Sequence, residues 1–211
     1  MALSRPLIVA TALDVLDDEG LDGLTLRRIA DRLGVKAPAL YWHFADKKAL
    51  VDDMATELMR RAVAAYPEPG AAGEWRAVVA DAAGHLRDVL RAHRDGARVF
   101  SGSLLTDPTV VAAQERPLRI LVDAGFAERD AALAWSTMRD LVVGFVIEEQ
   151  EVYGPGGEIR EAYRPELRAT VVDADRYPLA YRSGPTAWGG ADERFVDAVR
   201  YLVDGMAARL R

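Results

Sequence analysis

The chain lacks several residue types and patterns that would allow particular kinds of chemistry. It has no cysteine, which excludes disulfides, thiolate metal sites and cysteine catalysis. It has no asparagine and only three lysines against 24 arginines, a bias typical of GC-rich bacterial genomes. No stretch of about 18 apolar residues exists that could span a membrane, and the first nine residues show no secretory signal. We therefore expect a cytoplasmic protein without a membrane partner.

The chain also lacks an overall positive charge, since its formal net charge is −6. This value argues at first against a nucleic-acid partner, but net charge is a poor guide where basic residues are clustered. Residues 25–48 hold six basic side chains against two acidic ones and so carry a charge of +4. Ordinary surface charge would explain the cluster equally well, so the charge pattern alone does not decide.

Helical periodicity dominates the chain and no strand-like alternation persists, so we predict an all-α fold. Half of the residues are hydrophobic, enough for a sizeable core. We expect mostly loop over 154–190, where four prolines interrupt the pattern, with one short helix near 164–172. A connection is expected at 66–73. The predicted helices cover 5–19, 25–33, a segment starting near 37, 47–65, 75–92, 97–103, 108–124, 128–153 and 192–210.

Two short helices joined by a turn are predicted within residues 24–48, LTLRRIADRLGVKAPALYWHFADKK. Thr25 is a suitable N-cap for the first helix. Gly34 allows the left-handed backbone that such a turn requires, and Pro38 suits the first turn of the second helix. These features together make a helix-turn-helix pattern, which is typical of DNA-binding proteins.

Large aromatic side chains crowd the second of these helices. Leu40 and Phe44 are four residues apart and can both face inward, which leaves at least some of Tyr41, Trp42 and His43 exposed. Exposed aromatics beside basic residues suit contacts with phosphates, sugars and thymine methyls. The alternative is that Tyr41 and Trp42 pack on the neighbouring helices.

The segment resembles the DNA-binding domain of the TetR family of bacterial repressors, through LTLRRIADRLGV, PALYWHF and the lysine pair that follows. HRDGARV at 93–99 and VIEEQE at 146–151 extend the similarity to the tetracycline-repressor subgroup. The resemblance implies an N-terminal three-helix bundle with a helix-turn-helix, residues 1–47, and a C-terminal helical ligand-binding and dimerisation domain, residues 48–211. It implies a ligand-responsive repressor without a catalytic residue. We expect no cofactor, and no metal because of the substitution at Phe100 that is described below.

The resemblance also implies contacts with double-stranded operator DNA. Arg27 would reach a base edge from the second helix, and the residues at the start of the recognition helix would face bases. The aromatic residues would lie along the groove wall. Thr25 and Lys47 would contact phosphates, and Lys36 would add charge at the same surface. The implied set is Thr25, Arg27, Lys36, Ala37, Pro38, Ala39, Tyr41, Trp42, His43 and Lys47. Ala37 and Ala39 stand where relatives of the tetracycline repressor often carry polar groups. Because an alanine offers only methyl contacts, we expect the operator to differ from the operators of those relatives.

By the same resemblance, a small-molecule effector would bind among the middle helices, in a mostly apolar pocket. Phe100 stands where the tetracycline repressor has a metal-binding histidine, and phenylalanine cannot ligate a metal. We therefore expect an apolar or aromatic effector and weak binding of magnesium–tetracycline. For Trp135 and Arg139 packing is an alternative, and Glu148 could instead be a solvated or ion-paired residue. The implied set is Val63, Ala82, Leu86, Phe100, Ser103, Pro117, Trp135, Arg139 and Glu148.

Two segments carry more apolar surface than one chain needs. Residues 128–153 are apolar around much of the helix, and 192–210 have a clean apolar stripe. The resemblance implies that both join a four-helix bundle in a homodimer, which would hold two recognition helices one DNA turn apart over a palindrome. Effector binding would then move the 47–65 helix, with 93–99 as the trigger, and release DNA. The alternative is that both segments fill the core of a single monomer.

Two other function classes stay open from the residues alone. Glu148, Glu149 and Glu151 with His85 or His93 could indicate acid–base or metal chemistry. The sequence contains no metalloprotease, phosphate-loop or nucleophile-elbow motif to support an enzyme. A DNA-binding activator or architectural protein without an effector is the remaining alternative.

Overall fold

The computed structural model describes residues 3–65, 75–154 and 157–210, and within them the chain is all-helical apart from one isolated bridge between Tyr153 and Ile159. This confirms the predicted fold class. The expected connection at 66–73 lies outside the described residues. The helices are α1 (Arg5–Gly23), α2 (Leu26–Leu33), α3 (Pro38–Tyr41), α4 (Lys47–Ala64), α5 (Trp75–Arg91), α6 (Gly96–Phe100), α7 (Pro108–Ala112), α8 (Glu115–Asp123), α9 (Glu128–Val152), α10 (Pro165–Val171), α11 (Pro178–Trp188) and α12 (Ala191–Ala207).

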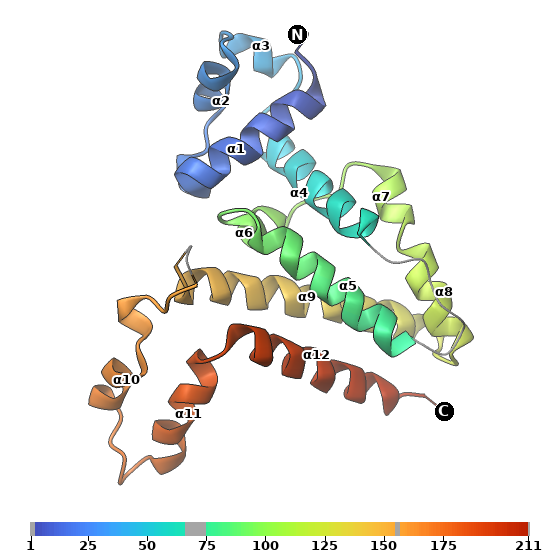
Figure 1. The fold of residues 1–211 in the computed structure, drawn as a ribbon. Helices are drawn as coiled ribbons and strands as arrows, with labels where there is room; N and C mark the ends of the chain where they lie inside the picture. Colours follow the sequence, from blue (N-terminus) through green and yellow to red (C-terminus); the bar gives the residue numbers. More distant parts are fainter. Residues whose placement is uncertain (1–2, 66–74, 155–156, 211) are drawn as a thin grey trace.

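Helices α1 to α3 gather at one end of the molecule, and α4 runs from them towards the remaining helices (Figure 1). The helical path of α1 is interrupted at Gly20, whose φ of 71° is the left-handed value that glycine tolerates. Asp46 begins α4 by accepting a hydrogen bond from the Ala49 amide at 2.8 Å. The N-terminal three-helix arrangement is therefore confirmed, with α4 as the link.

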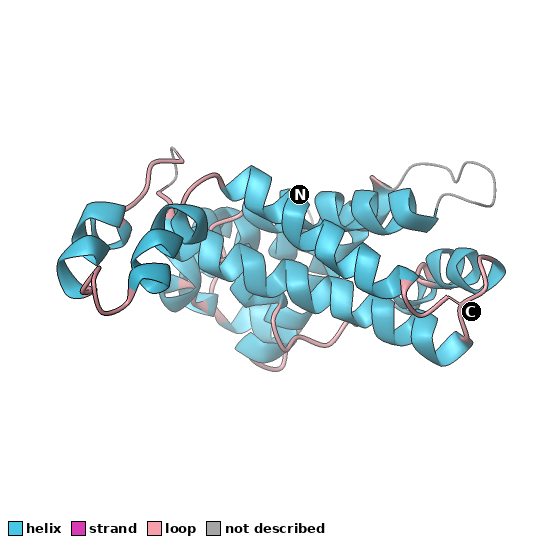
Figure 2. Cartoon of the chain, turned by 90° about the horizontal axis from the view of Figure 1, so that it is seen from below, coloured by secondary structure: helices cyan, strands magenta, loops and turns pink. Residues whose placement is uncertain are grey.

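The C-terminal part is built on α5, α9 and α12, which pack on one another, with α4 and α6 against α5. Seen from below, the helices lie side by side and short loops join them (Figure 2). None of the described helices is long and apolar enough to cross a membrane. This layered helical body is the expected C-terminal domain.

One continuous hydrophobic core extends through both ends of the described chain. Helix α4 joins the two ends because it is buried along its length: Leu50, Met54, Leu58 and Ala62 have no exposed surface. It packs with α1 of the N-terminal part and with α5 and α6 of the C-terminal part. A movement of α4 therefore cannot leave either end of the molecule unaffected.

The structure corrects two predictions about helix boundaries. The single helix expected at 108–124 is divided into α7 and α8, since Pro117 lacks the amide hydrogen that a continuous helix would donate to Ala113. The stretch 154–190 contains α11 as well as the expected short helix α10. Prolines suggested a loop there, but Pro178 occupies the first turn of α11, where the missing amide hydrogen does no harm.

Candidate nucleic-acid interface and helical ligand domain

The helix-turn-helix has the local geometry that its sequence predicts. The Thr25 hydroxyl accepts a hydrogen bond from the Arg28 amide at 3.2 Å and caps α2. Gly34 ends α2 with φ 68°, and its amide bonds the last carbonyls of the helix. Leu40 and Phe44 are buried and fix α3 against the N-terminal core. The Thr25 oxygen accepts only from the backbone, so its O–H is free to donate to a phosphate.

The aromatic side chains of α3 point into solvent. Tyr41 is 57% exposed and Trp42 is 90% exposed, so the alternative in which they pack on neighbouring helices is wrong for this chain. His43 is half-buried, and its backbone carbonyl is held by Arg5 at 2.7 Å. Large exposed aromatics have no stabilising role in a free protomer, which makes a binding role the better explanation.

The basic charge of residues 25–48 is less available than the sequence suggests. Four of the six basic side chains are held by partners within the chain. The pairs are Arg28 with Glu19, Arg32 with Asp18, Lys47 with the carbonyl of Leu21, and Lys48 with Asp52. Arg27 and Lys36 are exposed and have no ion pair or hydrogen bond within the described residues. These two cations and the exposed aromatic side chains are the members of the expected interface that are least engaged by other parts of the protomer.

The other expected DNA-contacting residues are placed around this surface. Pro38 is exposed, and Ala37 and Ala39 are half-buried in and beside α3. Lys47 is exposed, and its ammonium donates one of its three hydrogens to the Leu21 carbonyl at 3.0 Å. Contact of these residues with DNA stays a prediction.

The nine expected effector residues come from α4, α5, α6, the segment after α6, α8 and α9. Ala82, Leu86, Phe100 and Pro117 are buried, and Glu148 is exposed. The other four are half-buried: Val63, Ser103, Trp135 and Arg139. Two hollows, one of about 180 Å³ beside α1 and one of about 1660 Å³ beside the C-terminal end of α9, are lined by none of the nine. The apolar pocket expected from the sequence therefore coincides with neither of these two hollows and stays a prediction.

A buried ion-pair network joins three helices of the C-terminal part. Arg87 of α5 donates from Nε and Nη2 to the carboxylate of Glu149 of α9, at 3.0 and 2.7 Å, and their side chains are 8% and 7% exposed. The guanidinium also bonds Asp192 of α12 at 2.7 Å and lies 4.7 Å from the Phe195 ring centroid. The Arg87 hydrogen bond lowers the pKa of Asp192. The buried carboxylate of this run is thus Glu149, while Glu148 faces solvent.

The segment 93–98 attaches the C-terminal part to the end of α1. The His93 ring bonds Asp17 through Nδ1 at 2.9 Å and Arg61 through Nε2 at 3.0 Å. Asp95, at a left-handed φ of 56°, accepts the Leu21 amide at 2.8 Å. The sequence indicated this segment as the trigger, and its geometry places it between the two parts of the molecule.

The acidic and histidine residues considered for catalysis do not assemble into a metal centre. Among the described residues no group of three or more histidines, aspartates or glutamates could hold a metal ion. Glu149 is occupied by Arg87, and Glu148 and Glu151 are exposed. His93 is bound to Asp17 and Arg61. Of these three carboxylates, Glu149 forms a buried ion pair between α9 and α5, and the other two face solvent.

A helix-turn-helix with exposed aromatics, carried on a larger helical domain, defines the class of helix-turn-helix DNA-binding regulators. Residues 8–54 match the family described as bacterial regulatory proteins, tetR family, and residues 66–210 match the Tetracyclin repressor-like, C-terminal domain. The chain belongs to the TetR family of transcriptional regulators.

Similar proteins extend over nearly the whole chain. The tetracycline repressor protein class A from transposon 1721 of Escherichia coli is 37% identical, covering 96% of this chain and 89% of the relative. A possible TetR family transcriptional regulator from Streptomyces coelicolor A3(2) is 36% identical with a TM-score of 0.83, covering 97% and 99%. The Streptomyces coelicolor protein ActR, solved in complex with actinorhodin, is 25% identical with a TM-score of 0.86, covering 99% and 98%.

Two residues beside the recognition helix escaped the sequence analysis, Arg5 and Asp53. They form an ion pair at 2.9 Å, although they are 48 positions apart. Arginine at a helix start and aspartate within an amphipathic helix are both common on surfaces, so no signal in the sequence singles them out.

Proposed function

We propose that this chain is a transcriptional repressor that binds a palindromic operator as a homodimer and is released by a small apolar or aromatic effector. The observation that carries the proposal is the surface of α3, where Tyr41 and Trp42 stand exposed beside the unpaired Arg27 and Lys36. In this proposal residues 1–47 bind DNA and residues 48–211 bind the effector and the second copy.

The proposed dimer interface lies on α9 and α12. Both helices bury one face inside the protomer, yet their outward faces expose large apolar side chains, including Leu133, Val196 and Tyr201. Isolated protomers rarely leave such patches uncovered. A second copy packed there would place two α3 helices on one face of the dimer, as the reading of a palindrome requires.

The proposed effector is apolar or aromatic because most of the residues proposed to surround it are apolar. Leu86 and Phe100 are buried, and Phe100 offers no ligand for a metal ion. ActR, with its bound actinorhodin, supports a small organic molecule as the effector class. We expect magnesium–tetracycline to bind weakly, and isothermal titration showing submicromolar, magnesium-dependent affinity would contradict this part of the proposal.

The two rival functions receive less support. We assign no catalytic activity, since Glu149 is neutralised by Arg87 and the neighbouring carboxylates face solvent. An activator or architectural protein without an effector would need no domain of this size behind the DNA-binding helices. Ligand screening by thermal shift separates this alternative, because a repressor of the proposed kind gains stability with one class of small molecule.

The test is selection of DNA from a random-sequence pool, followed by footprinting on the recovered duplex. We expect a protected palindrome with half-sites about one helical turn apart. The Tyr41→Ala, Trp42→Ala double variant should lose specific binding at unchanged melting temperature, because both side chains are exposed. Tyr177→Ala, at an exposed tyrosine of the other end of the chain, is the matched control. Selection of no duplex by protein free of bound small molecules would refute the proposal.

A further inference from the structure

Arg5, the first residue of α1, connects three parts of the N-terminal domain. Its Nη1 donates to the His43 carbonyl at 2.7 Å, directly after α3. Its Nε and Nη2 reach one carboxylate oxygen of Asp53 in α4, at 3.0 and 2.9 Å. The guanidinium also lies 4.4 Å from the centroid of the Phe44 ring. The end of the recognition helix is therefore held to α4 through one side chain.

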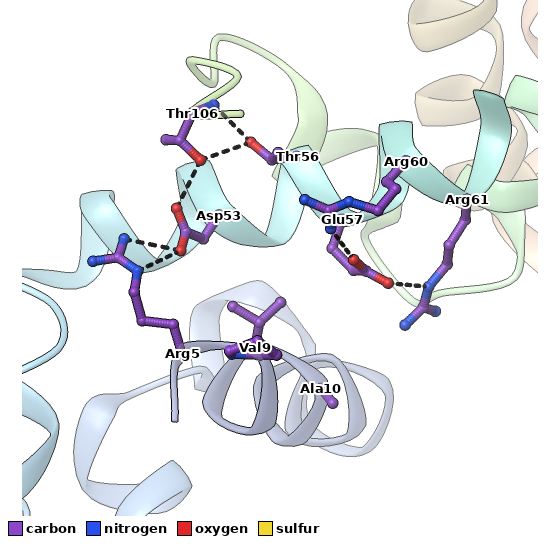
Figure 3. Close-up of a pocket in the computed structure, with 10 residues that line it drawn as sticks. Arg5, Val9, Ala10, Asp53, Thr56, Glu57, Arg60, Arg61 and Thr106 are labelled. Atoms are coloured by element: carbon purple, nitrogen blue, oxygen red, sulfur yellow. Dashed lines mark hydrogen bonds and ion pairs between the residues drawn. The ribbon is translucent and has the colours of Figure 1, made fainter. Parts of the chain in front are cut away.

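The second carboxylate oxygen of Asp53 is bound from the other domain. It accepts a hydrogen bond from the Thr106 hydroxyl at 2.8 Å. Thr106 lies in the segment 101–107 that joins α6 to α7, and its amide donates to the Thr56 hydroxyl at 2.8 Å. Figure 3 shows Thr106, Asp53 and Arg5 in sequence along the side of α4.

The segment 101–107 is attached to α4 at further points. The Leu104 amide donates to Asp52 at 2.8 Å, and Arg60 pairs with Asp107 at 2.8 Å. The segment begins directly after Phe100, at the end of α6. Any change at the C-terminal end of α6 is thus passed to the same face of α4 that holds Arg5.

A hollow of about 180 Å³ lies beside this chain of contacts. It is lined by α1 and α4 side chains, among them Arg5, Val9, Asp53 and Glu57, and by Thr106 (Figure 3). The hollow shows that the polar side chains at this edge of α1 and α4 are not tightly packed on one another. Arg5 is half exposed, so its ion pair is worth little as stability and acts through geometry.

We propose that Asp53 is a positioning residue, which transmits the position of segment 101–107 through Arg5 to the end of the recognition helix. This inference rests on the proposed function and names the route by which the ligand domain controls the DNA-binding surface. Thr106 orients the carboxylate, the carboxylate orients the guanidinium, and the guanidinium holds the His43 carbonyl. Loss of the Thr106 hydroxyl leaves the Asp53 carboxylate held by Arg5 without its link to segment 101–107, and so loosens the support of α3.

The experiment compares full-length variants at Thr106 and Arg5, with the duplex that the wild-type protein selects from a random-sequence pool as the probe. Thr106→Val removes the hydroxyl at nearly constant shape and should weaken binding about fivefold, as expected for one hydrogen bond. Thr106→Ser restores the hydroxyl and should bind within about twofold of wild type. Thr109→Val is the matched control, since its hydroxyl bonds only Asp107 within the start of α7 and does not touch Asp53.

A double-variant cycle shows whether Thr106 and Arg5 act on DNA binding through one route or independently. Arg5→Gln combined with Thr106→Val should bind no more weakly than Arg5→Gln alone, because both changes break one route. Melting temperatures should fall by no more than about 4 °C in any single variant, as expected for one hydrogen bond, so that a loss of DNA binding does not reflect unfolding. Additive losses, or a Thr109→Val loss equal to that of Thr106→Val, would overturn the inference.

Hydrogen–deuterium exchange tests the same route without DNA. Amides of residues 40–46 should exchange faster in Thr106→Val than in wild type or Thr109→Val. Faster exchange with no selected duplex would support the route and refute the repressor proposal. Unchanged exchange, whether or not a duplex is selected, would overturn the route.

Discussion

Raising the salt concentration should weaken operator binding by this chain only gradually. Protein–DNA affinity falls with salt because each phosphate that a cation neutralises releases bound counterions. In residues 25–48 four of the six basic side chains are already engaged within the protomer. Arg27 and Lys36 are left, so the proposed dimer presents four free cations from this segment.

The size of the effect follows from that number. With about −0.9 per phosphate contact, four contacts give a slope of about −3.6 in a plot of log affinity against log salt. If every basic residue of the segment held a phosphate, the slope would be about −11. The two cases are far enough apart to be separated by fluorescence anisotropy with the selected duplex between 50 and 300 mM potassium chloride.

Two variants make the assignment specific. Arg27→Gln should reduce the steepness of the salt dependence by about 2, since the dimer loses two of its four free cations at the DNA surface. Arg32→Gln, the matched control, should leave the slope within about half a unit, because Arg32 is paired with Asp18. A wild-type slope steeper than about −7 would refute the reasoning and would mean that DNA competes successfully for the internally paired cations.

Three further predictions follow from contacts in the C-terminal part. Glu149→Ala should lower the free energy of unfolding in urea by about 3 kcal/mol, since it leaves the buried Arg87 with too few partners. The control Glu148→Ala should change it by under about 0.5 kcal/mol. Equal effects of the two variants would contradict the observed burial of Glu149. Hydrogen bonds from Arg60 and then from Thr109 lower the pKa of Asp107 from 3.8 to about 2, so its contribution to stability is present above pH 3.8 and is lost towards pH 2. The melting temperature of Asp107→Asn should therefore lie below that of wild type at pH 7 and meet it near pH 2. Tyr201→Arg should convert the proposed dimer to a monomer in light scattering without loss of helicity, and a persistent dimer would place the interface elsewhere.

Local signals made the helix-turn-helix predictable. The cap at Thr25, the left-handed turn at Gly34 and the pair Leu40 and Phe44 each act within a few residues, so one sequence contains the whole pattern. Helix α11 was missed for the converse reason, since proline can begin a helix as well as prevent one.

Contacts between distant residues could not be predicted in this way. Adjacent positions of a helix point about 100° apart, so only the packing of α9 decides that Glu149 and not Glu148 is buried. Its partner Arg87 lies 62 positions away. The internal partners of Arg28 and Arg32 likewise come from α1, and without them the charge available to DNA was overestimated.

The continuous core along α4 has a consequence for thermal unfolding and for the exchange of domains between relatives. Because Leu50, Met54, Leu58 and Ala62 are all buried in one cluster that also contains residues of α1 and of the C-terminal helices, α4 belongs to the core of both parts. The molecule should therefore melt in one cooperative transition, although its two proposed tasks are separate. A functional boundary at residue 47 is then not a place to cut. An exchange of DNA-binding heads between relatives has to preserve the contacts of α4 with both parts, or it divides a single folding unit.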